Sequence, residues 1–453
     1  MELGFETCGN ATIIAYENGT PVVATDPWIE GEPYFGAWRL PYEISARQLG
    51  AIKGARYIWF SHGHPDHLNP DSLDHIREST ILVPQHVGRR ILTDLEQRGF
   101  RTRELRSREW VQLSSRIRVL SIADWNQDGC LLVAFDNRCA VLNLNDGNAW
   151  ANKQFLKRQL ASFPIRFALR LVNNGDADLV NVFDETGQCT FAPQPALRLG
   201  ERYGRLLKCW NATHTAPFSC FHAYNRSDTK WAAGFEAPLP AHQVGFDPAA
   251  GVFIPGYFAY DVVRDRVDLL PMTPIEQPLK DPAVYGDDWS QDLNRGDRAK
   301  IDRYFRRFEH LQTSLGFLRF RVGTTEHSLV FDRTDSRGIS LQAPRNALMS
   351  AVEYEIFDDL LIGNFVKVTL HGGLKSLYPD FTPYVAKYGD NGRAHSATEL
   401  RQYFRAYARA GGLEFWKDWL EFKGVARLRY LLSGNDHLYG AARRAYGWVR
   451  SRA

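Results

Sequence analysis

The stretch Ser61-His62-Gly63-His64-Pro65-Asp66-His67 is the most informative part of the sequence. It has four side chains that can bind metal within six residues, directly after a short apolar segment. Imidazole and carboxylate groups are good ligands for zinc and for iron. A turn at a strand end projects successive side chains in different directions from a rigid base, and Gly63 and Pro65 suit such a turn. A polar turn with accidental histidines is the alternative, but three histidines and an aspartate rarely share this spacing by chance. We therefore predict a metal-binding loop formed by His62, His64, Asp66 and His67.

The residues around this loop indicate short strands that alternate with helices. Ala11–Tyr16 and Pro21–Thr25 are apolar runs on either side of Asn18-Gly19, which is a strong hairpin signal. The aromatic and β-branched run Arg56–Phe60 leads into the loop as a strand. Further strands are expected at Thr80–Val83, Arg116–Ile122, Cys130–Asp136 and Cys139–Leu144, with helices starting at Pro70 and covering His86–Arg98. This alternation predicts an α/β fold class, arranged as an α+β sandwich.

The chain has 453 residues, which is more than one core usually supports. We expect a metal-binding domain over 1–235, a connecting or covering segment rich in Pro, Gly and Asp over 236–310, and a C-terminal α+β domain over 311–453. In the last domain, strands are expected at Gly316–Val322, Ser328–Phe331 and Phe365–Leu370, with helices near Asn346–Ile362 and over 397–423. It loosely resembles a sterol-carrier-type fold, although a plain accessory domain is the favoured alternative.

Composition excludes several classes of protein. A net charge of +3 is too small for a nucleic-acid binder. None of the six cysteines forms a C-x-x-C pair, and the first ten residues lack the basic start and apolar core of a leader. No apolar run approaches the roughly 20 residues that span a bilayer. We therefore expect a cytoplasmic protein without membrane contact. The basic segment 424–453 could touch an anionic surface or a redox partner, but a solvated helix is favoured.

The loop resembles the H-x-H-x-D-H signature of the metallo-β-lactamase superfamily. The early hairpin followed by Asp26 also fits, as does Asp146, about 80 residues after the loop at a strand end. The resemblance covers roughly residues 1–235 and implies a metallo-β-lactamase-like αββα fold with two divalent metal ions. By this resemblance His62 and His64 bind one ion, Asp66 and His67 bind the other, and Asp146 bridges them. Asp66 and Asp146 are then the catalytic carboxylates.

The sequence departs from the superfamily pattern at one metal ligand. A histidine usually completes the first ligand set about 20 residues before the bridging aspartate, but Ser121–Cys130 contains none. Asp124 or Asp128 could replace it, and oxygen ligation favours iron or manganese over zinc. Alternatively, both aspartates only cap turns. Asp128 lies nearer the next strand, whereas the spacing to Asp146 favours Asp124. For the last ligand of the second ion, His222 is the first choice and His214 the second.

One branch of the superfamily fits best. Val141–Asp146, Pro217–Tyr224 and Arg226-Ser227-Asp228 are together similar to the lactamase-like part of CMP-N-acetylneuraminate hydroxylases. Those enzymes also carry a Rieske iron–sulfur domain, which needs paired Cys-x-His and Cys-x-x-His ligands. In this sequence Cys220-Phe221-His222 is the only Cys-x-His. We therefore expect no Rieske centre here, so an oxygenase reaction would take electrons from a separate protein or from the substrate.

Three hypotheses about function follow. The first is a zinc- or iron-dependent hydrolase that attacks an ester, lactone or phosphodiester with a metal-activated water. Arg226 or Lys230 would bind an anionic part of its small-molecule substrate, although surface salt bridging is the plainer role. The second is a non-haem di-iron oxygenase acting on a nucleotide-linked or amino sugar, or on a small biosynthetic intermediate. The third, motivated by the missing histidine, is a degenerate fold retained as a binding module.

Overall fold

The computed structural model describes residues 1–172, 180–190, 198–332, 334–378, 381–389 and 392–432, and it divides the chain into two compact units. The first unit contains the described residues of Met1–Asn174, Gln194–Asn225 and Glu236–Pro278. The second contains those of Gly175–Pro193, Arg226–Phe235 and Leu279–Ala453. The segment 236–310, which was expected to connect two domains, is divided between the two units. Its part up to Pro278 belongs to the first unit, and its part from Leu279 on belongs to the second.

The first unit contains a mixed sheet whose described strands follow the order β18-β17-β1-β2-β3-β5-β6-β7. The expected hairpin turn is present, since Asn18 and Gly19 both have positive φ values, 51° and 76°. The strand before this hairpin was not predicted, and it pairs with a strand from the far end of the unit. The strands are β1 (Leu3–Cys8), β2 (Thr12–Glu17), β3 (Thr20–Thr25), β5 (Tyr57–Trp59), β6 (Thr80–Pro84), β7 (Arg101–Leu105), β17 (Phe258–Asp261) and β18 (Arg266–Leu269).

A second sheet of the same unit has its described strands in the order β16-β14-β12-β11-β10-β9-β8. Its inner face packs against the first sheet around Phe5, Trp59, Val133 and Phe167, which share one buried core. The strands are β8 (Trp110–Gln112), β9 (Ile117–Ala123), β10 (Gly129–Phe135), β11 (Cys139–Asn145), β12 (Ile165–Arg170), β14 (His214–Thr215) and β16 (Val252–Phe253).

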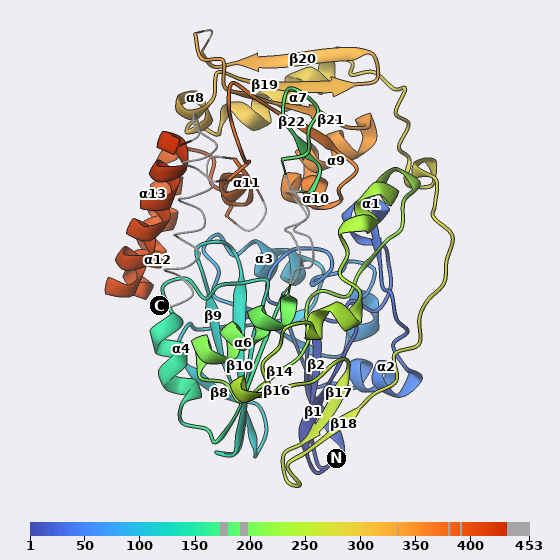
Figure 1. Cartoon of the computed structure of the whole chain (residues 1–453), viewed down its shortest axis with the longest axis vertical. Helices are drawn as coiled ribbons and strands as arrows, with labels where there is room; N and C mark the ends of the chain where they lie inside the picture. Colours follow the sequence, from blue (N-terminus) through green and yellow to red (C-terminus); the bar gives the residue numbers. More distant parts are fainter. Residues whose placement is uncertain (173–179, 191–197, 333, 379–380, 390–391, 433–453) are drawn as a thin grey trace. The chain divides into compact units, whose positions relative to one another are not determined.

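Helices cover the outer face of each sheet (Figure 1). α2 (Ala46–Lys53), the 3-10 helix η1 (Leu73–Ile76) and α3 (Arg90–Gln97) pack on the first sheet, and α4 (Lys153–Leu160) and α6 (Leu199–Trp210) pack on the second. Because both sheets are buried on two faces, β10 and β11 are apolar throughout most of their length and fully buried. The unit is therefore an αββα sandwich, which confirms the expected fold class.

Short elements complete the first unit beside the ends of the strands. They include α1 (Pro33–Gly36) and a small antiparallel pair of β4 (Trp38–Arg39) with β15 (Ala223–Tyr224). The 3-10 helices η3 (Leu239–Gln243) and η4 (Pro248–Ala250) precede β16. The pairing of β4 with β15 brings Trp38 to the segment that carries His222.

The second unit is an α+β structure, as expected for the C-terminal region. Its described strands follow the order β13-β22-β21-β19-β20, and Phe305 packs on Phe320 and Phe357. The helix expected near Asn346–Ile362 is broken at Glu355, whose φ is 60°. The strands are β13 (Val182–Phe183), β19 (Phe317–Val322), β20 (Thr325–Val330), β21 (Gly338–Gln342) and β22 (Lys367–His371). The helices are η2 (Ser227–Phe235), η5 (Pro282–Tyr285), α7 (Arg295–Arg306), α8 (Leu311–Ser314), α9 (Arg345–Tyr354), α10 (Phe357–Ile362), α11 (Thr382–Tyr388), α12 (Ala397–Gly411) and α13 (Leu413–Leu432).

None of the described helices is both long and apolar enough to cross a membrane. The likeness of the second unit to a sterol-carrier fold stays a prediction.

Candidate metal centre

The histidine-rich loop is anchored at its first residue, Ser61, which follows β5. The Ser61 amide donates to Oδ1 of Asp26 over 2.7 Å, and its hydroxyl lies 2.8 Å from Nδ1 of His62. Asp26 Oδ2 also lies 3.2 Å from Nδ1 of His67 and accepts a bond from Asn145. Asp26 is buried. Its contacts connect the end of β3 with the metal loop and with the end of β11.

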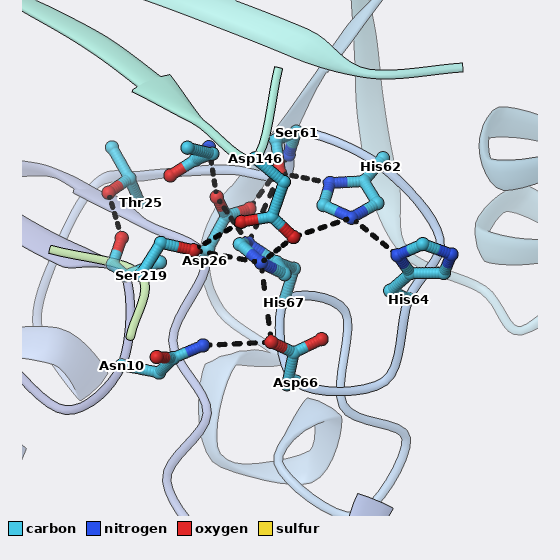
Figure 2. A network of polar contacts seen from close by, with 12 residues as sticks. Asn10, Thr25, Asp26, Ser61, His62, His64, Asp66, His67, Asp146 and Ser219 are labelled. Carbon is cyan, nitrogen blue, oxygen red and sulfur yellow. Dashed lines mark hydrogen bonds and ion pairs between the residues drawn. The ribbon is translucent and has the colours of Figure 1, made fainter. Parts of the chain in front are cut away.

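Three side chains of different origin converge beside this anchor: His62, His67 and Asp146, whose nearest ligand atoms all lie within 4.8 Å of one another (Figure 2). Nε2 of His67 is 3.3 Å from Oδ2 of Asp146, and Nε2 of His62 is 3.8 Å from the same oxygen. Two ligands bound to one ion at roughly 2.1 Å each lie at most about 4.2 Å apart. The two distances to Asp146 fall within this limit, so its carboxylate could share a metal ion with either imidazole.

His64 and Asp66 extend the cluster on two sides. Nδ1 of His64 lies 2.9 Å from Nε2 of His62, and Oδ2 of Asp66 lies 3.4 Å from Nε2 of His67. Both oxygens of Asp66 accept hydrogen bonds, one from the Asn10 amide at 2.8 Å and the other from the Tyr34 hydroxyl. The structure thus brings together the four loop residues and the aspartate at the end of β11.

Opposite charges face each other in this buried group. Burial lowers the pKa of His67, but Asp66 and Asp146 more than offset it, and the pKa of His67 lies well above its usual value. Burial acts to raise the pKa of Asp146, yet His67 and His62 hold it below the ordinary range. Burial and the neighbouring histidines keep the pKa of His62 well below its usual value. A metal ion that binds here would displace the His67 proton, since a ligating imidazole is neutral.

Asp128 lies beside the cluster, at the start of β10. A Cβ built on the next residue, Gly129, would lie 2.3 Å from the carbonyl oxygen of Ser61, so only glycine allows this close approach to the loop. Burial, followed by the charge of Asp146, raises the pKa of Asp128 to about 6, while His64 opposes the shift. Asp128 is therefore a buried carboxylate near His64 and Asp146.

Asp124 is oriented toward backbone groups instead. Its Oδ1 accepts from the Asn126 amide at 2.8 Å and its Oδ2 from the Trp150 amide at 3.2 Å. These bonds join the β9–β10 loop to the loop after Asp146. Burial and the charge of Asp128 raise the pKa of Asp124 well above its usual value. The two aspartates left open by the sequence thus have different surroundings.

The two late histidines, His222 and His214, also have different surroundings. His222 stacks on Trp38 with ring centroids 3.7 Å apart, and burial lowers its pKa to about 4 although the charge of Asp146 opposes this. His214, in β14, stacks on Phe167 and is bonded to the Thr213 hydroxyl. The structure brings His222 toward the cluster and places His214 in aromatic surroundings.

The two basic residues considered for substrate binding lie in the second unit. Arg226 is fully buried and bonds both oxygens of Asp228, at 2.9 and 2.8 Å, and Asp287 at 2.7 Å. The guanidinium is thus a counter-ion to two carboxylates of its own unit, and its expected contact with a substrate stays a prediction. Lys230 is exposed in η2, and its role stays a prediction.

Sequence reasoning did not place Asn10, Tyr34, Ser219 or His86 in the site. Ser219 donates to Oδ1 of Asp146 at 2.6 Å, and Nε2 of His86 lies 2.8 Å from the Ser61 carbonyl oxygen. Each comes from a segment outside the loop. Only Ser219 had a local signal, because it lies within Pro217–Tyr224, a segment that the sequence had already singled out.

Comparison with curated proteins supports the resemblance to the lactamase-like branch. The chain is 27% identical over 126 residues to a cytidine monophosphate-N-acetylneuraminic acid hydroxylase of Asterias rubens, covering 26% of this chain and 19% of that protein. The protein of the same name from Sus scrofa is 28% identical over 130 residues, 27% of this chain and 30% of its own length. The chain thus matches less than a third of these relatives. No protein-family model matches it.

Among solved structures, the chain is similar to CmlA, a diiron beta-hydroxylase from Streptomyces venezuelae, with a TM-score of 0.36 and 15% identity over 56% of this chain and 52% of that one. A metallo-beta-lactamase fold protein from Bacillus subtilis, YhfI, gives a TM-score of 0.28 at 10% identity, covering 46% of this chain and 78% of that one. Likeness at these TM-scores has no bearing on the activity of this chain.

Proposed function

We propose that this chain is a non-haem di-iron oxygenase that hydroxylates a small molecule. In this proposal His62, His64 and Asp128 bind the first ion. Asp66, His67 and His222 bind the second, and Asp146 bridges the two. The proposal has two supports: the donor set of the cluster, and the sequence similarity to proteins named as hydroxylases.

The observation that carries the proposal is the buried carboxylate of Asp128 beside His64 and Asp146. A histidine at this position would complete a nitrogen-rich set suited to zinc. A carboxylate makes the set richer in hard oxygen donors, which favours iron or manganese. Oxygen ligands also stabilise the ferric state that oxygen chemistry requires.

The named relatives suggest the class of substrate. A nucleotide-linked or amino sugar is the first candidate, and another small biosynthetic intermediate the second. In this proposal the electrons come from a redox partner or from the substrate.

A hydrolase is the second candidate. The compact contact of Asp146 with both His62 and His67 favours it, because a pair of close metal ions lowers the pKa of a bridging water toward neutrality. Asp66 or Asp146 would then accept the proton of that water. Such an enzyme would cleave an ester, a lactone or a phosphodiester and would work fully with redox-inert zinc.

The two aspartates of the β9–β10 loop provide the test. Asp128→Ala should remove about one metal ion per chain, and Asp128→His should shift the preference toward zinc, because imidazole is the softer ligand. Asp124→Ala is the matched control: it removes a carboxylate four residues away that bonds to backbone amides, so metal identity should not change.

The reaction itself is tested with oxygen. Iron-loaded protein supplied with a reductant should take up oxygen, and the product should be heavier by one oxygen atom. Zinc-loaded protein should take up none. Full turnover of a substrate with zinc alone would overturn the oxygenase proposal in favour of the hydrolase.

A further inference from the structure

Asn10 lies in the turn between β1 and β2, and its polar groups bind two separate parts of the metal centre. It is 2% exposed. Its Nδ2 donates to Oδ2 of Asp66 over 2.8 Å, which Figure 2 shows. Its Oδ1 accepts from the Phe221 amide at 2.9 Å, and its carbonyl oxygen accepts from the Ser219 amide at 2.9 Å. The amide thus holds the metal loop at one end and the loop that carries His222 at the other.

These contacts join segments that are far apart in the chain. Asp66 is 56 residues from Asn10, and Phe221 is 211 residues away. Ser219 has a φ of 55°, a left-handed conformation that costs a serine free energy and persists only where its surroundings enforce it. Its amide bond to Asn10 and its hydroxyl bond to Asp146 supply that support.

Aromatic contacts hold the same two groups from the other side. Tyr34 donates its hydroxyl to Asp66, and its ring packs edge-on against Trp38 at 4.6 Å between centroids. Trp38 in turn stacks on His222. Asp66 and His222 are therefore each fixed by a second group, and Asn10 connects the two through hydrogen bonds.

We propose that Asn10 is the positioning residue of the second metal site: it orients Asp66 and fixes the backbone next to His222, so that both meet the ion shared with His67. This inference rests on the metal centre of the proposed function. A group that orients a metal ligand without binding the metal typically changes metal affinity 10- to 100-fold when it is removed.

Other residues support the ligands of the first metal site. Ser61 contacts His62, and His86 contacts the Ser61 carbonyl, so this side of the cluster is supported from β5 and from the segment after β6. Loss of Asn10 should therefore weaken one ion and spare the other.

Asn10→Asp is the sharpest substitution. It keeps an acceptor for the Phe221 amide but replaces the donor to Asp66 with a second carboxylate. In titrations with cobalt(II) as the probe, followed by absorption, the wild type should bind two ions. The variant should bind one ion with unchanged affinity and the other about 10- to 100-fold more weakly. Asn10→Ala, which loses both side-chain bonds, should give the same split.

Two further variants assign the effect to the second site. In an Asp128→Ala background, where the second site alone is left, Asn10→Asp should weaken the remaining ion. Asn181→Ala is the control, because it removes a comparably buried amide in the second unit that bonds to backbone carbonyls of Asn364 and Val366. It should lower stability in urea without changing either cobalt affinity.

The outcomes separate this inference from the proposed function. If the wild type binds two cobalt ions and Asn10→Asp leaves both affinities unchanged, or lowers both equally, Asn10 does not position the second site. The same holds if Asn181→Ala produces the same split. A wild type that binds no cobalt overturns the metal centre itself, and this inference with it.

Discussion

Each of the two units buries a cluster of charged side chains, and the two clusters differ in what neutralises them. In the second unit, Arg226 is surrounded by Asp228 and Asp287 and lies over the ring of Phe365 at 4.1 Å. In the first unit, the described partners of Asp66 and Asp146 are histidines, hydroxyls and an amide. One cluster contains its own permanent cation. The other has donor groups that a metal cation would complete.

A structural charge cluster can therefore be distinguished from a metal centre by the cationic side chain that it contains. A guanidinium is always charged and satisfies carboxylates through several bonds at once. An imidazole carries a proton that a metal ion can replace. A buried group of carboxylates with histidines is therefore the better candidate for chemistry, and a buried group with arginine the better candidate for stability.

The largest expected effect is on the second unit. Arg226→Met should lower the free energy of unfolding by about 3–5 kcal/mol, because it leaves the buried Asp287 and the partly buried Asp228 without their counter-ion. Urea unfolding measures this. Arg321→Met, in an ion pair with Glu326 in which both side chains are about half exposed, is the control and should cost at most about 1 kcal/mol. Equal losses for the two variants would contradict the structural role of Arg226.

A ligand of the first unit should show the opposite pattern. His64→Ala should weaken metal binding at the first site more than about 100-fold, since loss of a direct ligand exceeds the cost of losing an outer partner. The fold should remain, because the loop rests on strands with their own apolar core. Metal titration and circular dichroism of the same sample test this. An unfolded variant at room temperature would contradict it.

The bridging carboxylate should affect turnover more than metal content. Asp146→Asn should reduce iron-dependent oxygen uptake about 10- to 100-fold while most of the metal stays bound, because an amide bridges two ions poorly. Metal analysis and oxygen uptake are measured on one preparation. If turnover is unchanged, Asp146 does not bridge the ions.

Much of the first unit could be predicted from the sequence, because the signals are local. The metal loop is contiguous, and the hairpin at Asn18-Gly19 and the strand before Asp146 follow from short patterns. The alternating apolar strands with intervening helices indicated the sandwich. The choice between Asp124 and Asp128 could not be made, since it depends on which backbone amides each carboxylate meets after folding.

The supporting residues could not be predicted, because their partners are distant. Asn10 meets Phe221 across 211 residues, and nothing near Asn10 in the sequence signals this. Salt bridging was one of the two roles considered for Arg226, but its partner Asp287 is 61 residues away and could not be named from the sequence. The expected boundary at 235 is where the superfamily resemblance ends. In the structure, Arg226–Phe235 belongs to the second unit and Glu236–Pro278 to the first.

We propose that the histidine–carboxylate cluster of the first unit binds a pair of iron ions. This is tested by metal analysis of protein purified without chelators or a nickel column, with Mössbauer spectroscopy on the same sample. We expect two iron ions per chain in one coupled pair. Zinc alone, in protein that is inert to reductant and oxygen, would contradict the oxygenase, and protein without bound metal would contradict the metal centre.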